Sequence, residues 1–163
     1  MKKLILVRHA KSDWNQEGVA DHERELNQRG KRDIPLMTSV LIQKYPRPDI
    51  ILSSDSVRTV GTIEGITKLG YTSSIIRYLP SLYLASPDTM QDELAGLDNT
   101  VETAFVCAHN PGISDYLNIL CPGNEFQHVT TLGSVLIVLN IETWSEIYSA
   151  KGRLVRFDYP KKK

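Results

Sequence analysis

Short apolar runs alternate with longer amphipathic segments along the chain. Four longer segments have apolar residues at helical spacing, at about 28–44, about 56–69, about 87–97, and from Pro111 to just before Cys121. Six shorter runs are typical of strands, at 4–7, 49–52, 74–78, 104–108, 134–140 and 154–159. This alternation predicts an α/β fold, a three-layer sandwich in which a mainly parallel central sheet has helices on both faces.

The first of these helices is the best defined by its pattern. Asn27 is a plausible N-cap, and Ile34, Met37 and Leu41 form an apolar stripe. Pro35 fits this helix poorly because proline has no backbone N–H to donate. The sequence therefore predicts either a kink at Pro35 or a later start of the helix.

Length and charge narrow the class of protein. The chain has 163 residues, of which 41% are hydrophobic, so we expect one globular domain over residues 1–163. It has 19 basic and 19 acidic residues, which gives no electrostatic basis for a nucleic-acid partner. The terminal lysines, 161–163, are expected to form a solvated tail.

The N-terminal segment and the cysteines predict a cytoplasmic protein. Met1-Lys2-Lys3 precedes only four apolar residues, too few for a secretory signal, and no run approaches the ~20 apolar residues of a membrane span. Cys107 and Cys121 have no Cys-x-x-Cys context, so we expect free thiols and no zinc site. The sequence leaves the oligomeric state open.

The predicted strands end in polar residues that suit phosphoryl chemistry. The first ends in Arg8-His9, the second opens into a segment containing Ser54 and Arg58, and the fourth ends in His109. Carboxyl ends of parallel strands meet at one edge of a sheet, where open α/β sheets bind ligands. Two histidines and two arginines at that edge would form a cationic pocket for a dianionic phosphoryl group, because arginine binds two phosphate oxygens and imidazole can attack phosphorus.

These motifs resemble those of the histidine phosphatase superfamily, also called phosphoglycerate mutase-like, and within it the short SixA-type phosphohistidine phosphatases. The resemblance covers nearly the whole chain, from residue 4 to about 138. It is carried by Arg8-His9-Ala10-Lys11-Ser12, Asp21-x-x-x-x-Leu26-Asn27-x-x-Gly30, Ser54-x-x-x-Arg58-Thr59 with Thr62 shortly after, and His109-Asn110-Pro111-Gly112.

The resemblance implies that His9 is the nucleophile, accepting a phosphoryl group that water then removes, with Arg8, Arg58 and His109 around its oxygens. His9 must be neutral at its attacking nitrogen, so its other nitrogen should donate to a carbonyl or carboxylate, whereas His109 should act as a charged donor. With these donors no metal or other cofactor is expected. Further candidates for phosphate or substrate contacts are Lys11, Ser12, Asp21, Ser54 and Asn110.

One departure from the family bears on the substrate. Mutases and phosphomonoesterases of the superfamily carry a glutamate after the third strand that protonates the leaving alkoxide, but residues 79–84 contain no carboxylate. Asp21, Glu23 and Asp88 are possible substitutes. His22 and His128 have no motif context and are expected to be surface or turn residues, although His128 could approach the rim of the pocket.

The leading substrate class is therefore phosphohistidine on a protein, since its N–P bond is easily broken and a chain this short leaves the pocket open. Small phosphate esters are the alternative substrates. A phosphate-binding module that does not catalyse a reaction is the alternative outside the enzymes. The presence of His9 beside Arg8 favours an enzyme over such a module. The sequence does not identify the physiological substrate or the pathway.

Overall fold

The computed structural model describes residues 1–123 and 128–161. Within them, each predicted strand and helix is present, with boundaries shifted by a few residues. The strands are β1 (Lys2–Arg8), β2 (Ile50–Ser54), β3 (Ile76–Leu79), β4 (Thr103–Ala108), β5 (Ser134–Leu139) and β6 (Gly152–Asp158). The helices are α1 (Gln28–Lys44), α2 (Val57–Lys68), α3 (Pro87–Ala95) and α4 (Gly112–Leu120), with 3-10 turns η1 (Asp21–Glu23), η2 (Pro80–Leu82) and η3 (Trp144–Ser149).

The strands form one sheet in the order β3-β2-β4-β1-β5-β6. The pairs β3/β2, β2/β4 and β4/β1 are parallel, whereas β5 runs antiparallel to β1 and β6 antiparallel to β5. The mainly parallel α/β sheet predicted from the sequence is thus confirmed, and the antiparallel pairs lie at one side of it.

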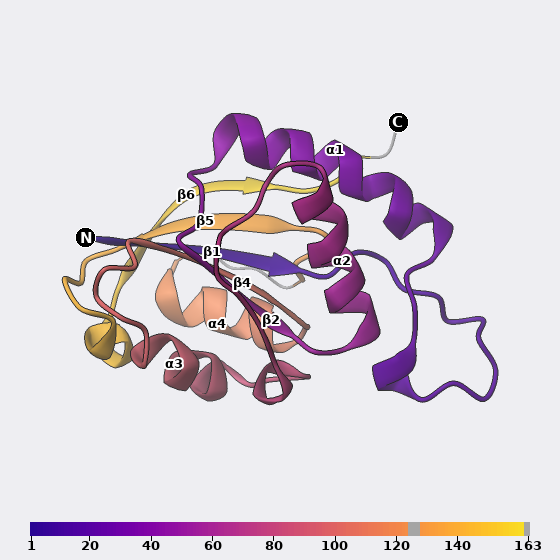
Figure 1. Ribbon diagram of the computed structural model, residues 1–163. Helices are drawn as coiled ribbons and strands as arrows, with labels where there is room; N and C mark the ends of the chain where they lie inside the picture. Colours follow the sequence, from indigo (N-terminus) through magenta and orange to yellow (C-terminus); the bar gives the residue numbers. More distant parts are fainter. Residues whose placement is uncertain (124–127, 162–163) are drawn as a thin grey trace.

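Helices cover both faces of the sheet, as Figure 1 shows with α1 on one side and α3 and α4 on the other. Alternate residues of β1 divide between two cores, because successive side chains of a strand point to opposite faces. Leu4 and Leu6 pack in the core formed with α3 and α4, and Ile5 and Val7 in the core formed with α1 and α2. Strands buried on both sides explain why the sequence shows continuous apolar runs.

Helix α1 continues through Pro35. The expected later start is wrong, and because Pro35 lies on the exposed side of the helix, water can donate to the carbonyl that lacks its backbone amide partner. Ile34, Met37 and Leu41 face the core as the pattern predicts. Asn27 caps the helix by accepting a hydrogen bond from the Gly30 amide at 2.8 Å.

In the described part of the chain, no helix has both the length and the apolar character required to cross a membrane. Cys107 and Cys121 are free thiols, as expected, and both are buried.

Candidate active site

The end of β1 holds His9 in a single tautomer. Its Nδ1 lies 2.7 Å from the carbonyl oxygen of Ala10, and because a carbonyl only accepts, Nδ1 carries the proton. Nε2 is left with its lone pair. Burial, opposed by the bond to Ala10, lowers the pKa of His9 to about 3, so the ring is neutral at pH 7. The expected donation to a carbonyl is confirmed.

Thr62 joins the end of β1 to α2. Its hydroxyl accepts from the amide of Ala10 at 3.0 Å and donates to the carbonyl of Arg58 at 2.7 Å. Because Thr62 lies four residues after Arg58, its hydroxyl holds the turn after His9 against the first turn of α2.

Arg58 lies in that first turn and is 2% exposed. Its Nη1 donates to the backbone carbonyl of Asp21 at 2.7 Å, and its Nη2 lies 3.0 Å from Asp21 Oδ2 and 3.3 Å from His109 Nδ1. Arg8 donates through Nη1 to the Val129 carbonyl at 3.1 Å. The Nε atoms of both arginines are buried without a hydrogen-bond partner in the described residues, so each guanidinium keeps donor capacity.

His109 is neutral, contrary to the charged donor expected from the sequence. Since arginine only donates, His109 Nδ1 must accept from Arg58, and Nε2 then donates to Ser54 Oγ at 2.8 Å. Burial and the positive charge of Arg58 lower the pKa of His109 to about 3. The fold places a cation directly beside this ring, and a second positive charge there is disfavoured.

Ser54 differs from the other candidate contacts. It is fully buried and lies behind His109 rather than on the wall of the cavity. A residue that faces inward at the end of β2 cannot reach a ligand, so its contact with His109 Nε2 orients that ring. The structure therefore places Ser54 behind His109 and not on the wall of the cavity, where it was expected from the sequence.

Asp21, on the turn η1, is an ionised carboxylate held by three donors. Arg24 donates to Oδ1 at 2.7 Å, Arg58 donates to Oδ2, and the Tyr83 hydroxyl also donates to Oδ2. The hydrogen bond from Tyr83, together with Arg24 and Arg58, holds the pKa of Asp21 well below its usual range. Asp21 therefore has no proton to give to a leaving group at neutral pH.

These side chains surround one cavity of about 280 Å³ at the carboxyl edge of the sheet. It brings together the candidates named from the sequence other than Ser54: Arg8, His9, Lys11, Ser12, Asp21, Arg58, His109 and Asn110. The ring centres of His9 and His109 are 5.2 Å apart. Glu23 and Asp88, the other possible acids, do not line it.

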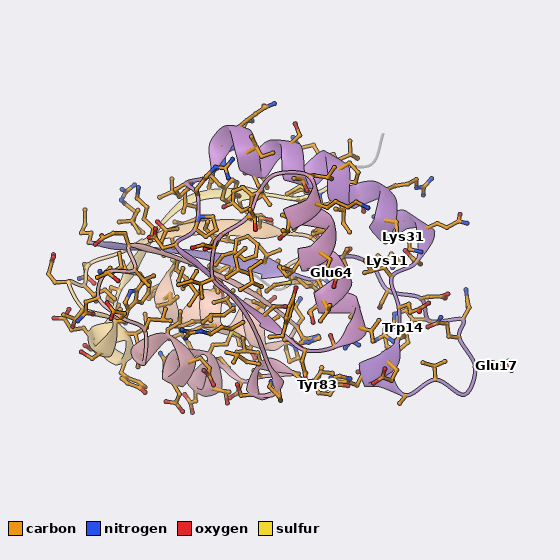
Figure 2. The ribbon with its side chains drawn as sticks, in the orientation of Figure 1. Lys11, Trp14, Glu17, Lys31, Glu64 and Tyr83 are labelled. Atoms are coloured by element: carbon orange, nitrogen blue, oxygen red, sulfur yellow. The ribbon has the colours of Figure 1, made fainter. Side chains whose placement is uncertain are left out.

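Four further residues line the cavity, and sequence reasoning missed them: Trp14, Arg24, Leu84 and Thr131. Arg24 is 7% exposed, bonds to Ser12 Oγ and stacks 3.7 Å from the centre of the Trp14 ring. A signal was present, since Arg24 falls inside the Asp21 to Gly30 motif and Trp14 is a large aromatic in a polar loop. Figure 2 shows Lys11, Trp14 and Tyr83 at the same end of the molecule.

The two histidines without motif context lie near the site. His128 Nε2 accepts from Arg8 Nη1 at 3.0 Å, so it reaches the rim of the pocket. His22 Nε2 lies 2.9 Å from Asp55 Oδ1, outside the cavity. Across residues 1–123 and 128–161, no three His, Cys, Asp or Glu side chains are grouped to hold a metal ion.

A neutral histidine and several arginines at the carboxyl edge of a parallel sheet define an α/β enzyme that handles phosphoryl groups. Residues 4–80 match the family model of the histidine phosphatase superfamily (branch 1). An uncharacterised protein of Mycobacterium leprae is 30% identical over 165 residues, covering 95% of this chain and 100% of that protein. The chain belongs to the histidine phosphatase superfamily and is a phosphatase.

Solved structures show the same fold. A candidate phosphohistidine phosphatase SixA from Agrobacterium tumefaciens has a TM-score of 0.83 and 24% identity, covering 98% of each chain. The protein histidine phosphatase SixA in complex with tungstate has a TM-score of 0.82 and 21% identity, covering 97% of each chain.

Proposed function

We propose that this protein is a metal-independent phosphohydrolase that works through a phosphohistidine intermediate on His9, and that its substrates are proteins carrying phosphohistidine. The observation that carries the first part is the bond from His9 Nδ1 to the Ala10 carbonyl, which leaves Nε2 unprotonated beside the arginines of the cavity. A phosphate-binding module has no need of an unprotonated nucleophile.

The reaction has two steps. His9 Nε2 attacks phosphorus, forming an N–P bond as the bond to the leaving group breaks and its electrons pass to the leaving nitrogen. The phosphorylated imidazole reacts in the form that carries a proton on its other nitrogen, so it leaves as neutral imidazole and takes no proton from the site. Water then attacks phosphorus of the phosphorylated His9, which releases inorganic phosphate and returns neutral His9.

Cationic donors fixed around the phosphoryl group supply the catalysis. Phosphoryl transfer spreads negative charge over the equatorial oxygens, so donors already in place stabilise the transition state. Arg8 and Arg58 each have an Nε without a partner in the described residues, and Arg24 lines the same cavity. His109 contributes by its position beside Arg58, with Ser54 orienting its ring.

The substrate class follows from the state of Asp21. In the described part of the chain it is the single carboxylate that lines the cavity, and its three donors keep it ionised. An alkyl ester leaves as an alkoxide that needs a proton, a contribution of about 10²–10⁴-fold in rate from a general acid. A phosphorylated imidazole needs no such acid, so phosphohistidine suits this site better than sugar phosphates.

The structural similarity supports the same proposal. The SixA structure named as a protein histidine phosphatase was solved with tungstate, a tetrahedral oxyanion like phosphate, and has this fold over 97% of its chain. The small cavity of about 280 Å³ opens to solvent beside Trp14, which is 75% exposed, and a phosphorylated side chain projecting from a protein can enter such a site.

A trapping experiment tests the nucleophile. Labelled phosphoramidate is mixed with the protein and quenched in base within one turnover. We expect base-stable, acid-labile label on His9, none in His9→Ala, and unchanged label in the control His22→Gln, whose ring lies outside the cavity. Turnover of His9→Ala within tenfold of the parent would contradict the mechanism.

A series of leaving groups tests the substrate class. We expect kcat/KM to be high for a histidine-phosphorylated protein, to fall steeply across aryl phosphates as the phenol becomes more basic, and to be very low for glycerate phosphates. A flat dependence that is lost in Asp21→Asn would identify Asp21 as a general acid and an ordinary phosphomonoesterase. Tungstate binding without turnover of any substrate would identify a binding module.

A further inference from the structure

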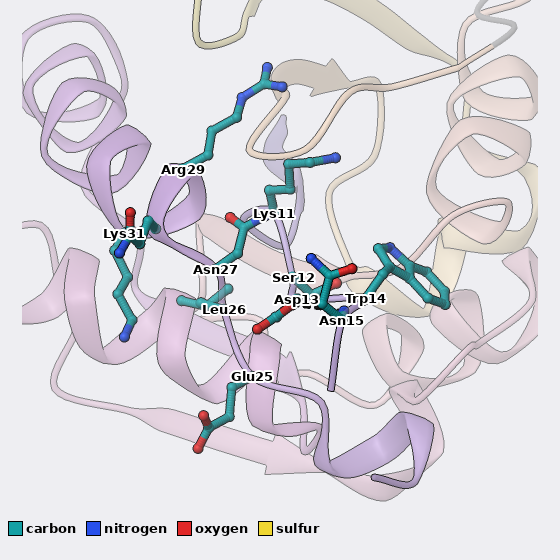
Figure 3. A pocket seen from close by; sticks show the side chains of 11 residues that line it. Lys11, Ser12, Asp13, Trp14, Asn15, Glu25, Leu26, Asn27, Arg29 and Lys31 are labelled. Atoms are coloured by element: carbon teal, nitrogen blue, oxygen red, sulfur yellow. Dashed lines mark hydrogen bonds between the residues drawn. The ribbon is translucent and has the colours of Figure 1, made fainter. Parts of the chain in front are cut away.

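A second and larger hollow adjoins the catalytic cavity. Its volume is about 620 Å³, and it shares Lys11, Ser12 and Trp14 with that cavity (Figure 3). The segment after β1 thus forms a common wall between the two. The charged residues Asp13, Glu25, Arg29 and Lys31 also line the hollow.

Trp14 stands on this common wall and is 75% exposed. Its ring is held by Arg24, because the guanidinium of Arg24 stacks on it at 3.7 Å from the ring centre. Arg24 in turn donates a hydrogen bond to Asp21. The other tryptophan, Trp144, is fully buried. An ordered aromatic that contributes little to the core is the kind of residue that carries binding energy in protein interfaces.

Cationic side chains extend this surface on the other side. In Figure 3 the side chains of Lys11 and Arg29 lie on one side of the hollow and Trp14 on the other, while the ammonium of Lys31 is directed away from them. Arg29 and Thr131 also line a third hollow of about 360 Å³. Thr131 lines the catalytic cavity as well. The catalytic cavity is therefore flanked by two open hollows.

The chemistry of these hollows fits a polypeptide better than a small molecule. Sites for small ligands are enclosed and mostly apolar, whereas the larger hollow is open, has a lining that is both polar and apolar, and has more than twice the volume of the catalytic cavity. The exposed tryptophan offers an apolar anchor, and the rim carries charges of both signs, Lys11 and Arg29 as well as Asp13 and Glu25, as in the interfaces of proteins that bind one another transiently.

We propose that Trp14, Lys11, Arg29 and Thr131 form a docking surface for the polypeptide around the phosphorylated histidine of a protein substrate. Trp14 takes an apolar side chain of that polypeptide, and Lys11 and Arg29 take an acidic one. This inference rests on the proposed function. It adds that recognition of the protein extends beyond the catalytic cavity, across Lys11, Trp14 and Thr131 on its wall to Arg29, which lies outside it.

Arg29→Gln gives the first test, because Arg29 does not line the catalytic cavity. We expect KM for a histidine-phosphorylated protein to rise about 3- to 10-fold with kcat unchanged, and kcat/KM for p-nitrophenyl phosphate to stay the same. Arg29→Lys should retain most of the affinity. Arg32→Gln is the matched control on the same helix, since Arg32 is exposed and lines none of the three hollows.

Trp14→Ala gives the second test. We expect the ratio of kcat/KM for the phosphoprotein to that for p-nitrophenyl phosphate to fall about 10-fold or more, and Trp14→Phe to restore part of it. Equal losses for both substrates in Trp14→Ala, with no KM effect in Arg29→Gln, would overturn the docking surface while leaving the proposed function intact. A KM effect of Arg29→Gln confined to small phosphates bearing an extra carboxylate would overturn the polypeptide as occupant.

The proposed function and the docking surface are distinguished by different outcomes. A parent enzyme that hydrolyses aryl phosphates but neither hydrolyses nor binds the histidine-phosphorylated protein would overturn both. Raising the salt concentration supplies an independent readout, because Lys11 and Arg29 act through charge. The KM for the phosphoprotein should rise with salt more steeply in the parent than in Arg29→Gln.

Discussion

Single residues at the site owe their charge states to burial and to one shared cation. His9 and His109 are both neutral because burial disfavours their charged forms, and Arg58 beside His109 adds to the effect. Asp21 is the opposite case, since Tyr83 and two arginines favour its ionised form. A neutral nucleophile among fixed cations is the arrangement that a phosphoryl dianion requires.

Arg58→Lys tests how far the geometry of that cation matters. Lysine keeps the charge but cannot bond Asp21 through two nitrogens and reach His109 as well. We expect kcat/KM for p-nitrophenyl phosphate to fall about 10²–10³-fold, with Arg32→Lys as the exposed control. Full activity in Arg58→Lys would reduce Arg58 to a structural ion pair.

At the scale of elements, the junction between β1 and α1 holds the catalytic loop in place. Gly30 in the first turn of α1 lies against the backbone of Lys11, and an added Cβ there would be 2.2 Å from the Lys11 carbonyl oxygen. The Asn27 amide donates to the same oxygen at 3.0 Å, and Ser12 pairs with Leu26. The Asp21 to Gly30 motif is therefore a close contact between helix and loop.

Gly30→Ala tests this contact. Helix propensity alone would make alanine more stable than glycine by about 1 kcal/mol, but the clash with the Lys11 carbonyl reverses the sign. We expect a loss of about 1–3 kcal/mol in the free energy of unfolding in urea, with lower activity because Lys11 and Ser12 shift. Gly96→Ala is the control, because its nearest contact would be 3.9 Å, and it should lose little. Unchanged stability in Gly30→Ala would contradict the close packing.

At the scale of the whole molecule, the cost of keeping histidines neutral appears as pH-dependent stability. His9 and His109 have a pKa of about 3 in the folded protein and an ordinary value of 6.5 when exposed. Between those values the unfolded chain binds more protons, so stability is fully present above pH 6.5 and is lost as the pH falls toward 3. His22, whose pKa is raised by Asp55 and Glu23, opposes this change.

Urea unfolding between pH 7 and pH 5 measures the effect. We expect the free energy of unfolding to fall by roughly 1 kcal/mol per pH unit for each buried histidine near pH 5, with a shallower slope in His9→Gln. The range stops at pH 5 because ordinary carboxylates titrate below it. Identical slopes in the parent and His9→Gln would show that His9 is not held neutral by the fold.

Chelation also acts on the whole molecule. Activity on p-nitrophenyl phosphate is expected to be the same with and without EDTA, because arginines in place around the phosphoryl group stabilise the charge that a metal would otherwise stabilise. Strict dependence on an added divalent ion would contradict the metal-independent mechanism.

The sequence by itself determined the sheet and the four central residues of the site. Apolar runs predict strands that are buried on both faces of a sheet. The carboxyl ends of parallel strands meet at one edge of that sheet, so Arg8, His9, Arg58 and His109 could be expected together. Local signals also fixed the N-cap Asn27. The continuation of α1 through Pro35 was not decidable, because a proline inside a helix can either kink it or mark its start.

Only the tertiary structure decided the chemistry of individual groups. Tyr83 bonds Asp21 from 62 positions away, and Arg58 reaches His109 from 51 positions away. A pKa depends on burial and on such partners, so the neutral state of His109 could not be found by reading along the chain. The position of Ser54 behind His109 was not predicted either, because the direction of a side chain at the end of a strand depends on its packing. The exposure of Trp14 beside the cavity likewise became visible only in three dimensions.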